Sequence, residues 1–156
     1  MDRFDALMHA AKAHAGATDK CGQPYVLHPI AVAMAVADNT NPGSEWHEDG
    51  AVVGLIHDIW EDTDYDLPTN QLRRSQYVAF QAVTRLPDET YGYYIEGICN
   101  CEYPVAIIVK LADLWHNLQS ERQDCLPAEE RRSLEKRYLK SRDWLWEALG
   151  QNWWPA

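Results

Sequence analysis

The chain has 156 residues, a length typical of one domain with a substantial apolar core, and we expect a single domain over residues 1–156. Its 24 acidic and 14 basic residues give a formal net charge of -10, which argues against a nucleic acid or an anionic membrane as the main partner. No apolar run approaches the length of a membrane span and the first residues lack the pattern of a signal peptide, so the expected location is the cytoplasm.

The first half of the chain predicts three helices separated by polar turns. Apolar residues at helical spacing, among them Phe4 and Leu7, predict a helix over about residues 2–16. Pro29 is well placed as the first residue of an alanine- and valine-rich helix that runs to about residue 37, because proline is tolerated in the first helical turn. Residues 39–44 form a predicted loop, and a further helix is expected over about residues 48–60.

The second half is also expected to be helical. Pro68 restarts the chain into a helix lasting to about residue 85, and a short helix follows through Tyr94. Residues 105–109 are rich in β-branched side chains, which favour strands. We nevertheless expect a helix there, since the run continues without a breaker to residue 118 and is too long for an ordinary strand. A charged helix from Pro127 to Gly150 follows, and the predicted fold class is all-α, a compact helical bundle.

The cysteines and several histidines carry little site signal. The four cysteines fit no zinc-finger spacing and are expected to be free thiols rather than disulfides in a cytosolic protein: Cys21, Cys99, Cys101 and Cys125. Three histidines are expected to be structural or at the surface: His9, His47 and His116. The aromatic residues 153–154 are expected in internal packing or in a contact between subunits, which leaves a homo-oligomer open.

The densest group of ionisable side chains is the run from His57 to Thr63. It holds one imidazole and three carboxylates within six consecutive residues, directly after the apolar stretch 51–56. On a helix, His57 and Glu61 would lie one turn apart, and so would Asp58 and Asp62, which places like charges close together. A cation among them would relieve that repulsion, and a divalent metal is the simplest candidate.

Two further segments place metal-type ligands on apolar elements. His28 precedes Pro29, and Asp113 follows the largely apolar residues 105–112. Together with His57 and Asp58 they make a mixed nitrogen and oxygen set, which suits manganese or iron(II) better than zinc. An octahedral ion with four protein ligands keeps two open positions, and a water bound there becomes acidic enough to serve as a nucleophile.

Several stretches of the chain resemble the HD-domain metal-dependent phosphohydrolases, specifically the hydrolase domains of RelA/SpoT-type enzymes and the stand-alone small alarmone hydrolases. They come in the family's order and at its approximate spacing: Ala13 to Gly16, Gly22 to Pro29, His57 to Thr63, and Val109 to Asp113 with His116 to Leu118. The resemblance implies the family's fold and its reaction, the removal of the 3′-pyrophosphate from guanosine tetra- or pentaphosphate. The partner would then be a small nucleotide substrate.

The resemblance also implies roles for individual residues. The ligands of one Mn2+ would be His28, His57, Asp58 and Asp113, the same four that the ligand chemistry selects. The catalytic pair that positions or deprotonates the attacking water would be Glu61 and Asp62. The substrate would be bound by Lys20, Lys110, Asn117 and Tyr138, with the lysines facing phosphates. The alternatives are an ordinary solvated helix end for the acidic pair and ordinary surface exposure for the lysines.

The chain departs from the family's pattern at two positions. Asp19 stands where alarmone hydrolases usually have an arginine that stacks on the guanine, and Leu114 replaces the arginine after the Ala–Asp pair. Two alternatives therefore stay open beside guanosine 3′-pyrophosphate hydrolysis. One is an enzyme of the same fold that acts on another nucleotide, such as a mono- or triphosphate hydrolase or a dinucleotide phosphatase. The other is a non-catalytic nucleotide-binding domain.

Overall fold

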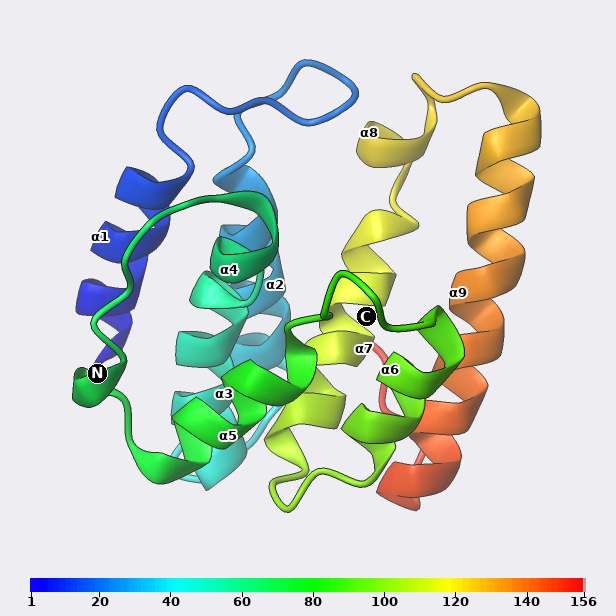
Figure 1. Ribbon diagram of the computed structural model, residues 1–156. Coiled ribbons are helices and arrows are strands. Elements are labelled where there is room, and N and C mark those ends of the chain that lie inside the picture. Colours follow the sequence, from blue (N-terminus) through cyan, green and yellow to red (C-terminus); the bar gives the residue numbers. More distant parts are fainter. Residues whose placement is uncertain (156) are drawn as a thin grey trace.

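The computed structural model describes residues 1–155, apart from the side chain of residue 45, and the chain folds into a helical bundle (Figure 1). Within these described residues there is no strand, and an isolated bridge joins Thr18 and Pro24. The all-α fold class that the sequence predicts is confirmed. The helices are α1 (Arg3–Ala13), α2 (Leu27–Asp38), α3 (Glu45–Ile56), α4 (Ile59–Asp62), the 3-10 helix η1 (Thr69–Gln71), α5 (Arg74–Val83), α6 (Tyr91–Cys99), α7 (Val105–Asn117), α8 (Ser120–Gln123) and α9 (Ala128–Leu149).

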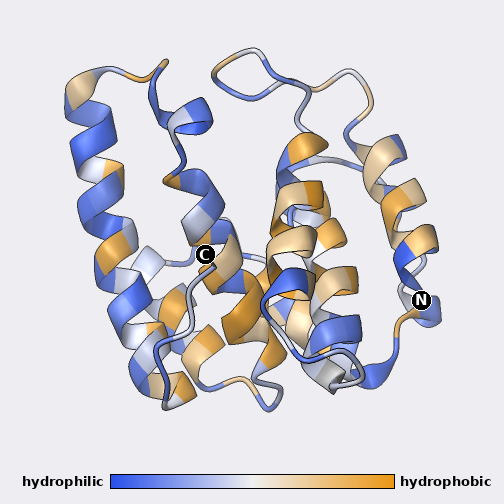
Figure 2. Ribbon diagram, turned by 180° about the vertical axis from the view of Figure 1, so that it is seen from behind, coloured by the Kyte–Doolittle hydropathy of each residue, from blue (hydrophilic) through white to orange (hydrophobic). Residues whose placement is uncertain are grey.

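Helices α3 and α7 form the centre of the bundle. Helix α2 packs against both of them, α1 and α5 pack against α3, and α6 and α9 lie beside α7 (Figure 1). Nearly every residue of α7 from Val105 to Leu114 is buried, and so is the stretch of α3 from Ala51 to Ile56. Apolar residues gather on the inner helices in Figure 2, whereas the outer helix α9 is largely hydrophilic. In the part of the chain that the structure describes, no helix has the length and apolar character that crossing a membrane requires.

Most of the predicted helices are confirmed, with ends that shift by a few residues. The segment 105–118 is helical, as its length indicates, although its first residues favour strands by composition. The charged helix α9 ends at Gly150, whose φ of 71° is the left-handed conformation that favours glycine at a helix end. The sequence does not predict helix α8, because a four-residue helix leaves no periodic pattern.

Two predicted helices are interrupted, which corrects their expected ranges. The helix expected over residues 48–60 stops at Ile56, and α4 begins at Ile59, so His57 and Asp58 lie in a turn rather than on one continuous helix. At this interruption the His57 ring bonds to the Gly54 carbonyl oxygen and the Asp58 carboxylate accepts from the Tyr25 hydroxyl, and both contacts hold the side chains in place. The helix expected over residues 68–85 is divided into η1 and α5. Arg73 has an extended backbone conformation and caps the start of α5: its backbone N–H donates to the Gln76 side chain at 3.0 Å.

A close approach of α2 and α3 depends on Gly54. A Cβ atom at this position would lie 3.1 Å from both the Cα and the backbone nitrogen of Ala33, which is tighter than most Cβ contacts in proteins. The two helices therefore touch backbone to backbone. Because α2 carries His28 and the end of α3 leads into His57, this contact brings the two imidazoles together, with ring centroids 5.2 Å apart.

Cys21 and Cys125 form a disulfide, which corrects the expectation of free thiols at these two positions. The pair is separated by 104 residues, yet the two Cα atoms lie 5.4 Å apart. The loop between α1 and α2 extends toward α8 and the start of α9, and this arrangement brings the cysteines together (Figure 1). Spacing along the chain gives no indication of such a contact. Cys99 and Cys101 remain free thiols, as expected.

Candidate metal centre and adjoining pocket

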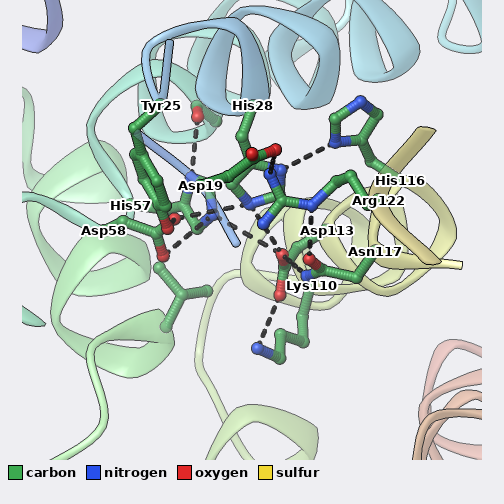
Figure 3. Close-up of polar contacts among 12 residues, drawn as sticks. Asp19, Tyr25, His28, His57, Asp58, Lys110, Asp113, His116, Asn117 and Arg122 are labelled. Carbon is green, nitrogen blue, oxygen red and sulfur yellow. Dashed lines mark hydrogen bonds and ion pairs between the residues drawn. The ribbon is translucent and has the colours of Figure 1, made fainter. Parts of the chain in front are cut away.

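The four residues predicted as metal ligands converge at one buried point from three parts of the bundle. His28 in α2, His57 after α3 and Asp113 in α7 are buried, and each offers a ligand atom within 4.8 Å of the others. Asp58 lies beside them, with Oδ1 3.0 Å from His57 Nε2 and Oδ2 3.4 Å from His28 Nε2. Asp113 Oδ1 lies 3.1 Å from His28 Nε2 and 3.7 Å from His57 Nε2 (Figure 3).

The surroundings of His57 fit a cation at this point. Its Nδ1 lies 2.8 Å from the Gly54 carbonyl oxygen, which turns Nε2 toward the two carboxylates. Nε2 is buried and makes no aligned hydrogen bond among the described residues. Burial lowers the pKa of His57, but Asp58 and Asp113 outweigh it and the pKa is raised to about 10. The carboxylates thus favour a positive charge here, and a divalent metal would supply it through ligands that such ions prefer.

Asp113 is held by two of the residues predicted to bind substrate. Lys110 Nζ donates to Asp113 Oδ2 at 2.7 Å, and Asn117 Nδ2 donates to Asp113 Oδ1 at 2.6 Å. Burial opposes ionisation of both partners of the Lys110–Asp113 pair, but their mutual attraction holds the Asp113 pKa well below and the Lys110 pKa well above its usual value. The Lys110 side chain is only 13% exposed. Before any substrate binds, the Lys110 ammonium is therefore already paired with a candidate metal ligand, Asp113.

The predicted catalytic pair, Glu61 and Asp62, lies on the short helix α4 directly after the candidate ligands. Glu61 Oε1 accepts a hydrogen bond from the Arg85 backbone N–H at 2.8 Å. Partial removal of water raises the pKa of the Glu61 carboxyl, and the Arg85 contact opposes that shift. Asp62 faces a pocket beside the candidate metal ligands. The pair thus borders the site, with Glu61 toward the α5–α6 loop and Asp62 toward the pocket.

A pocket of about 360 Å³ adjoins the candidate metal ligands. Three predicted substrate residues, Lys20, Asn117 and Tyr138, line it, whereas Lys110 is not among the lining residues. The other lining residues combine charged, polar and apolar side chains: Thr18, Asp19, Tyr25, Asp62, Arg122, Gln123, Leu126, Leu134 and Arg137. Three cationic side chains therefore face a cavity large enough for a small phosphorylated molecule.

Two curated relatives are each 30% identical to this chain. The GTP pyrophosphokinase of Streptomyces coelicolor matches over 125 residues, which are 72% of this chain and 14% of the relative. A probable guanosine-3′,5′-bis(diphosphate) 3′-pyrophosphohydrolase of Synechocystis matches over 140 residues, which are 83% of this chain and 18% of the relative. The chain therefore spans less than a fifth of the length of either relative. No family model matches it.

A solved structure with a similar fold is described as a metazoan ortholog of SpoT that hydrolyzes ppGpp. It has a TM-score of 0.76 and 22% sequence identity, and the match covers 92% of this chain and 84% of that chain. The chain has the HD-domain fold of the RelA/SpoT-type hydrolases. This is the fold that the resemblance in the sequence implies.

Within this HD-domain fold, His116 lies closer to the site than the sequence suggests. A hydrogen bond of 2.7 Å joins His116 Nδ1 to His28 Nδ1, and both rings are buried (Figure 3). Burial and the neighbouring His28 lower the pKa of His116 to about 4, so His116 is neutral near pH 7. The bond turns His28 Nε2 toward Asp58 and Asp113. The signal in the sequence is the spacing of three residues from Asp113 on one helix.

Tyr25 is a second site residue for which the sequence analysis predicts no role. Its hydroxyl donates to Asp58 Oδ2 at 2.7 Å, and burial followed by the negative charge of Asp58 raises its pKa. The buried ring of His14 lies against Tyr25, with ring centroids 4.8 Å apart. Both residues belong to stretches that carry the family resemblance, but only the folded chain indicates what they contact.

Asp19, which stands where the family pattern usually has an arginine, lies next to an arginine from another part of the chain, Arg122. Asp19 Oδ1 accepts hydrogen bonds of 2.9 Å from the backbone N–H groups of Cys21 and Gln23, which fixes the loop. Its Oδ2 lies 3.6 Å from Arg122 Nη1. Arg122 also donates to Asn117 Oδ1 at 3.0 Å, and its guanidinium carbon lies 5.8 Å from the centroid of the Tyr25 ring. The pocket therefore contains a guanidinium that comes from α8.

Proposed function

We propose that the protein is a metal-dependent phosphohydrolase that removes the 3′-pyrophosphate of guanosine tetra- or pentaphosphate. The observation that carries this proposal is the convergence of His28, His57, Asp58 and Asp113 beside a pocket lined by cationic side chains. Relatives named for 3′-pyrophosphate hydrolysis support the choice of substrate. A small nucleotide suits the net charge of -10 better than a nucleic acid does, and the cytoplasm is the compartment that we propose.

The four converging residues are the proposed ligands of one divalent metal, Mn2+ by preference. When bound, the metal would polarise a phosphate oxygen and acidify a water. The ring of His57 is oriented by the Gly54 carbonyl, and the ring of His28 by His116, so each presents Nε2 to the site. Tyr25 holds Asp58 in the same way through its hydroxyl.

The remaining residues have proposed roles that follow from their positions. Glu61 and Asp62 would accept the proton of the attacking water, and a raised carboxyl pKa brings Glu61 closer to the range where a general base is useful. Lys20 and Tyr138 would contact substrate in the pocket. Lys110 and Asn117 both donate to Asp113, so they would contact the substrate next to this candidate metal ligand. Lys110 would therefore bind only a phosphate group that lies close to the metal.

A second candidate is hydrolysis of another nucleotide by the same centre. The Asp19–Arg122 pair favours it, because the pocket wall presents a carboxylate, together with a guanidinium from a different segment, at the position where the family that the sequence resembles usually has an arginine. An enzyme that accepts another base, or a terminal phosphate, would keep the same metal ligands.

The test is a panel of nucleotides incubated with the protein and Mn2+, with released pyrophosphate and orthophosphate measured separately. Guanosine tetraphosphate should yield pyrophosphate alone. Asp58→Ala should lower that rate at least about a hundredfold, because it removes a ligand. Asp88→Ala, a change on the exposed α5–α6 loop, is the matched control and should keep the parent rate.

Two other outcomes would redirect the assignment. Orthophosphate release, or a faster reaction with another nucleotide, would favour the second candidate. An unchanged rate in Asp58→Ala would contradict the metal mechanism. A protein that binds no Mn2+ by elemental analysis and hydrolyses nothing would instead be the non-catalytic binding domain.

A further inference from the structure

Two segments far apart in the sequence are joined by three bonds at the edge of the pocket. We call residues 17–25 the hairpin loop and residues 122–130 the α8–α9 segment. The disulfide Cys21–Cys125 is the covalent link between them. An ion pair joins Lys20 to Glu130, and Asp19 lies 3.6 Å from Arg122, as Figure 3 shows for the last pair.

Both segments form walls of the same pocket. The hairpin loop contributes Thr18, Asp19 and Lys20, and the α8–α9 segment contributes Arg122, Gln123 and Leu126. Lys20 and Leu126 are the direct neighbours of the two bonded cysteines along the chain. The distance between the walls therefore depends on the bonds that join them.

The disulfide is the strongest of the three bonds. The Lys20 side chain is 68% exposed, and an ion pair at such a site contributes little to stability because water screens it. Helix α8 has four residues and is held to α7 through Asn117, which accepts from Arg122 Nε at 3.0 Å and, at its carbonyl oxygen, from the Gln123 side chain. The hairpin loop has internal hydrogen bonds, with Asp19 N–H donating to Gln23 O at 2.8 Å and Tyr25 N–H to Ala17 O at 2.9 Å. Residues 124–127 lie between α8 and the start of α9, so opening the disulfide would release this stretch of the α8–α9 segment more than the loop.

The disulfide is within reach of an external thiol. Cys125 is exposed and Cys21 is half-buried, so an attacking thiolate can approach the Cys125 sulfur without unfolding the bundle. Both cysteines lie in loops outside the helices that carry the candidate metal ligands. Breaking the bond would therefore leave His28, His57 and Asp113 in place.

We propose that Cys21–Cys125 is a thiol–disulfide exchange site through which a dithiol reductant loosens the wall of the nucleotide pocket. A thiolate of the reductant attacks Cys125 sulfur, the Cys21–Cys125 bond breaks, and Cys21 leaves as a thiolate. The second thiol of the reductant then displaces Cys125 and closes the reductant's own disulfide. Two electrons and two protons pass from the dithiol to the protein, which ends with two cysteine thiols. An oxidised dithiol restores the bond by the reverse steps.

The expected consequence concerns substrate binding, and it rests on the proposed function for the identity of the substrate. The joined walls hold the pocket residues in their binding positions before the nucleotide arrives. Reduction should raise KM for guanosine tetraphosphate about three- to tenfold, because ordering the loosened side chains then opposes binding. The kcat value should change less than twofold, since the candidate ligands and the acidic pair lie on other segments.

The experiment compares oxidised and dithiothreitol-reduced protein, each with Mn2+, in three measurements. A peptide map without reductant should contain a Cys21–Cys125 peptide in the oxidised protein. Amide hydrogen exchange over residues 118–127 should be at least about threefold faster after reduction, with α7 up to residue 114 unchanged. KM should rise as stated. Cys21→Ser/Cys125→Ser should match the reduced parent, and Cys99→Ser/Cys101→Ser should still respond to dithiothreitol.

The outcomes separate this proposal from the proposed function. Absence of the Cys21–Cys125 peptide from the oxidised protein, or equal hydrogen exchange in both redox states, would overturn the exchange site. If the protein hydrolyses no guanosine tetraphosphate, the proposed function fails, and peptide mapping with hydrogen exchange still decides the proposal about the pocket wall. If the double serine variant is unfolded by circular dichroism, the reduced parent provides the comparison.

Discussion

Lys110→Met tests whether the site contains its own counter-charge. In the parent protein the Lys110 ammonium donates to Asp113 Oδ2 at 2.7 Å, and both side chains are nearly buried, with 13% and 7% exposure. Methionine fills a similar volume without the charge, so the substitution leaves Asp113 buried without its cation. Asp113 keeps the hydrogen bond from Asn117 Nδ2 at 2.6 Å and the imidazole of His28 at 3.1 Å.

The size of the effect follows from that geometry. Removing one partner of a buried ion pair typically costs about 3–5 kcal/mol, and the partners that Asp113 retains place this case near the lower end, at about 3 kcal/mol. For a domain of this size that loss corresponds to a decrease in Tm of roughly 6–12 °C. Saturating Mn2+ should restore part of the loss, because a ligand that binds only the folded state stabilises it.

The assay is thermal and urea unfolding of the parent and the variant, in EDTA and then in Mn2+. Lys136→Met, which removes an exposed lysine of α9, is the matched control and should change stability by less than about 0.5 kcal/mol. Equal stability of Lys110→Met and parent in EDTA would refute the reasoning. Lys110 would then be free to act as a substrate lysine, as the family resemblance implies.

Three other perturbations have outcomes that the structure determines. Gly54→Ala should destabilise the fold by about 1–3 kcal/mol in urea unfolding, because the added Cβ would meet the backbone of α2. Gly97→Ala is the control: its added Cβ would meet nothing within 4 Å, so the change should be neutral or stabilising by up to about 1 kcal/mol. If Glu61 is the general base, the acid limb of the kcat/KM profile should lie above pH 4.5, because the carboxyl pKa is raised and activity is lost as pH falls through it. Glu61→Gln should abolish that limb and lower the rate about 10²–10⁴-fold, and an identical limb in the variant would assign it elsewhere. Reducing the Cys21–Cys125 disulfide should lower the free energy of unfolding by about 4–5 kcal/mol, since the bond closes a loop of 104 residues. The Tm values measured with and without dithiothreitol should then differ by roughly 8–20 °C. Equal Tm values would contradict the presence of the disulfide.

Much of the fold follows from local patterns in the sequence. The helical spacing of apolar residues predicts α1 and α9, Pro29 before an alanine- and valine-rich stretch predicts α2, and an unbroken run too long for a strand predicts α7. Each of these signals belongs to a short segment and needs no knowledge of its neighbours. The residue types of the candidate metal centre can also be recognised from the sequence. Imidazoles and carboxylates on apolar elements are unusual enough to be selected before their positions in space are known.

The sequence by itself therefore determined the all-α class and the residue types at the candidate metal centre. The tertiary structure decided where the helix breaks before His57 and Asp58, that His116 bonds to His28 across 88 residues, and that Cys21 meets Cys125 across 104. The physical reason is that these contacts form between segments whose separation along the chain says nothing about their distance after packing. Periodicity records which face of a helix is buried, and only the packed bundle specifies which side chain lies opposite.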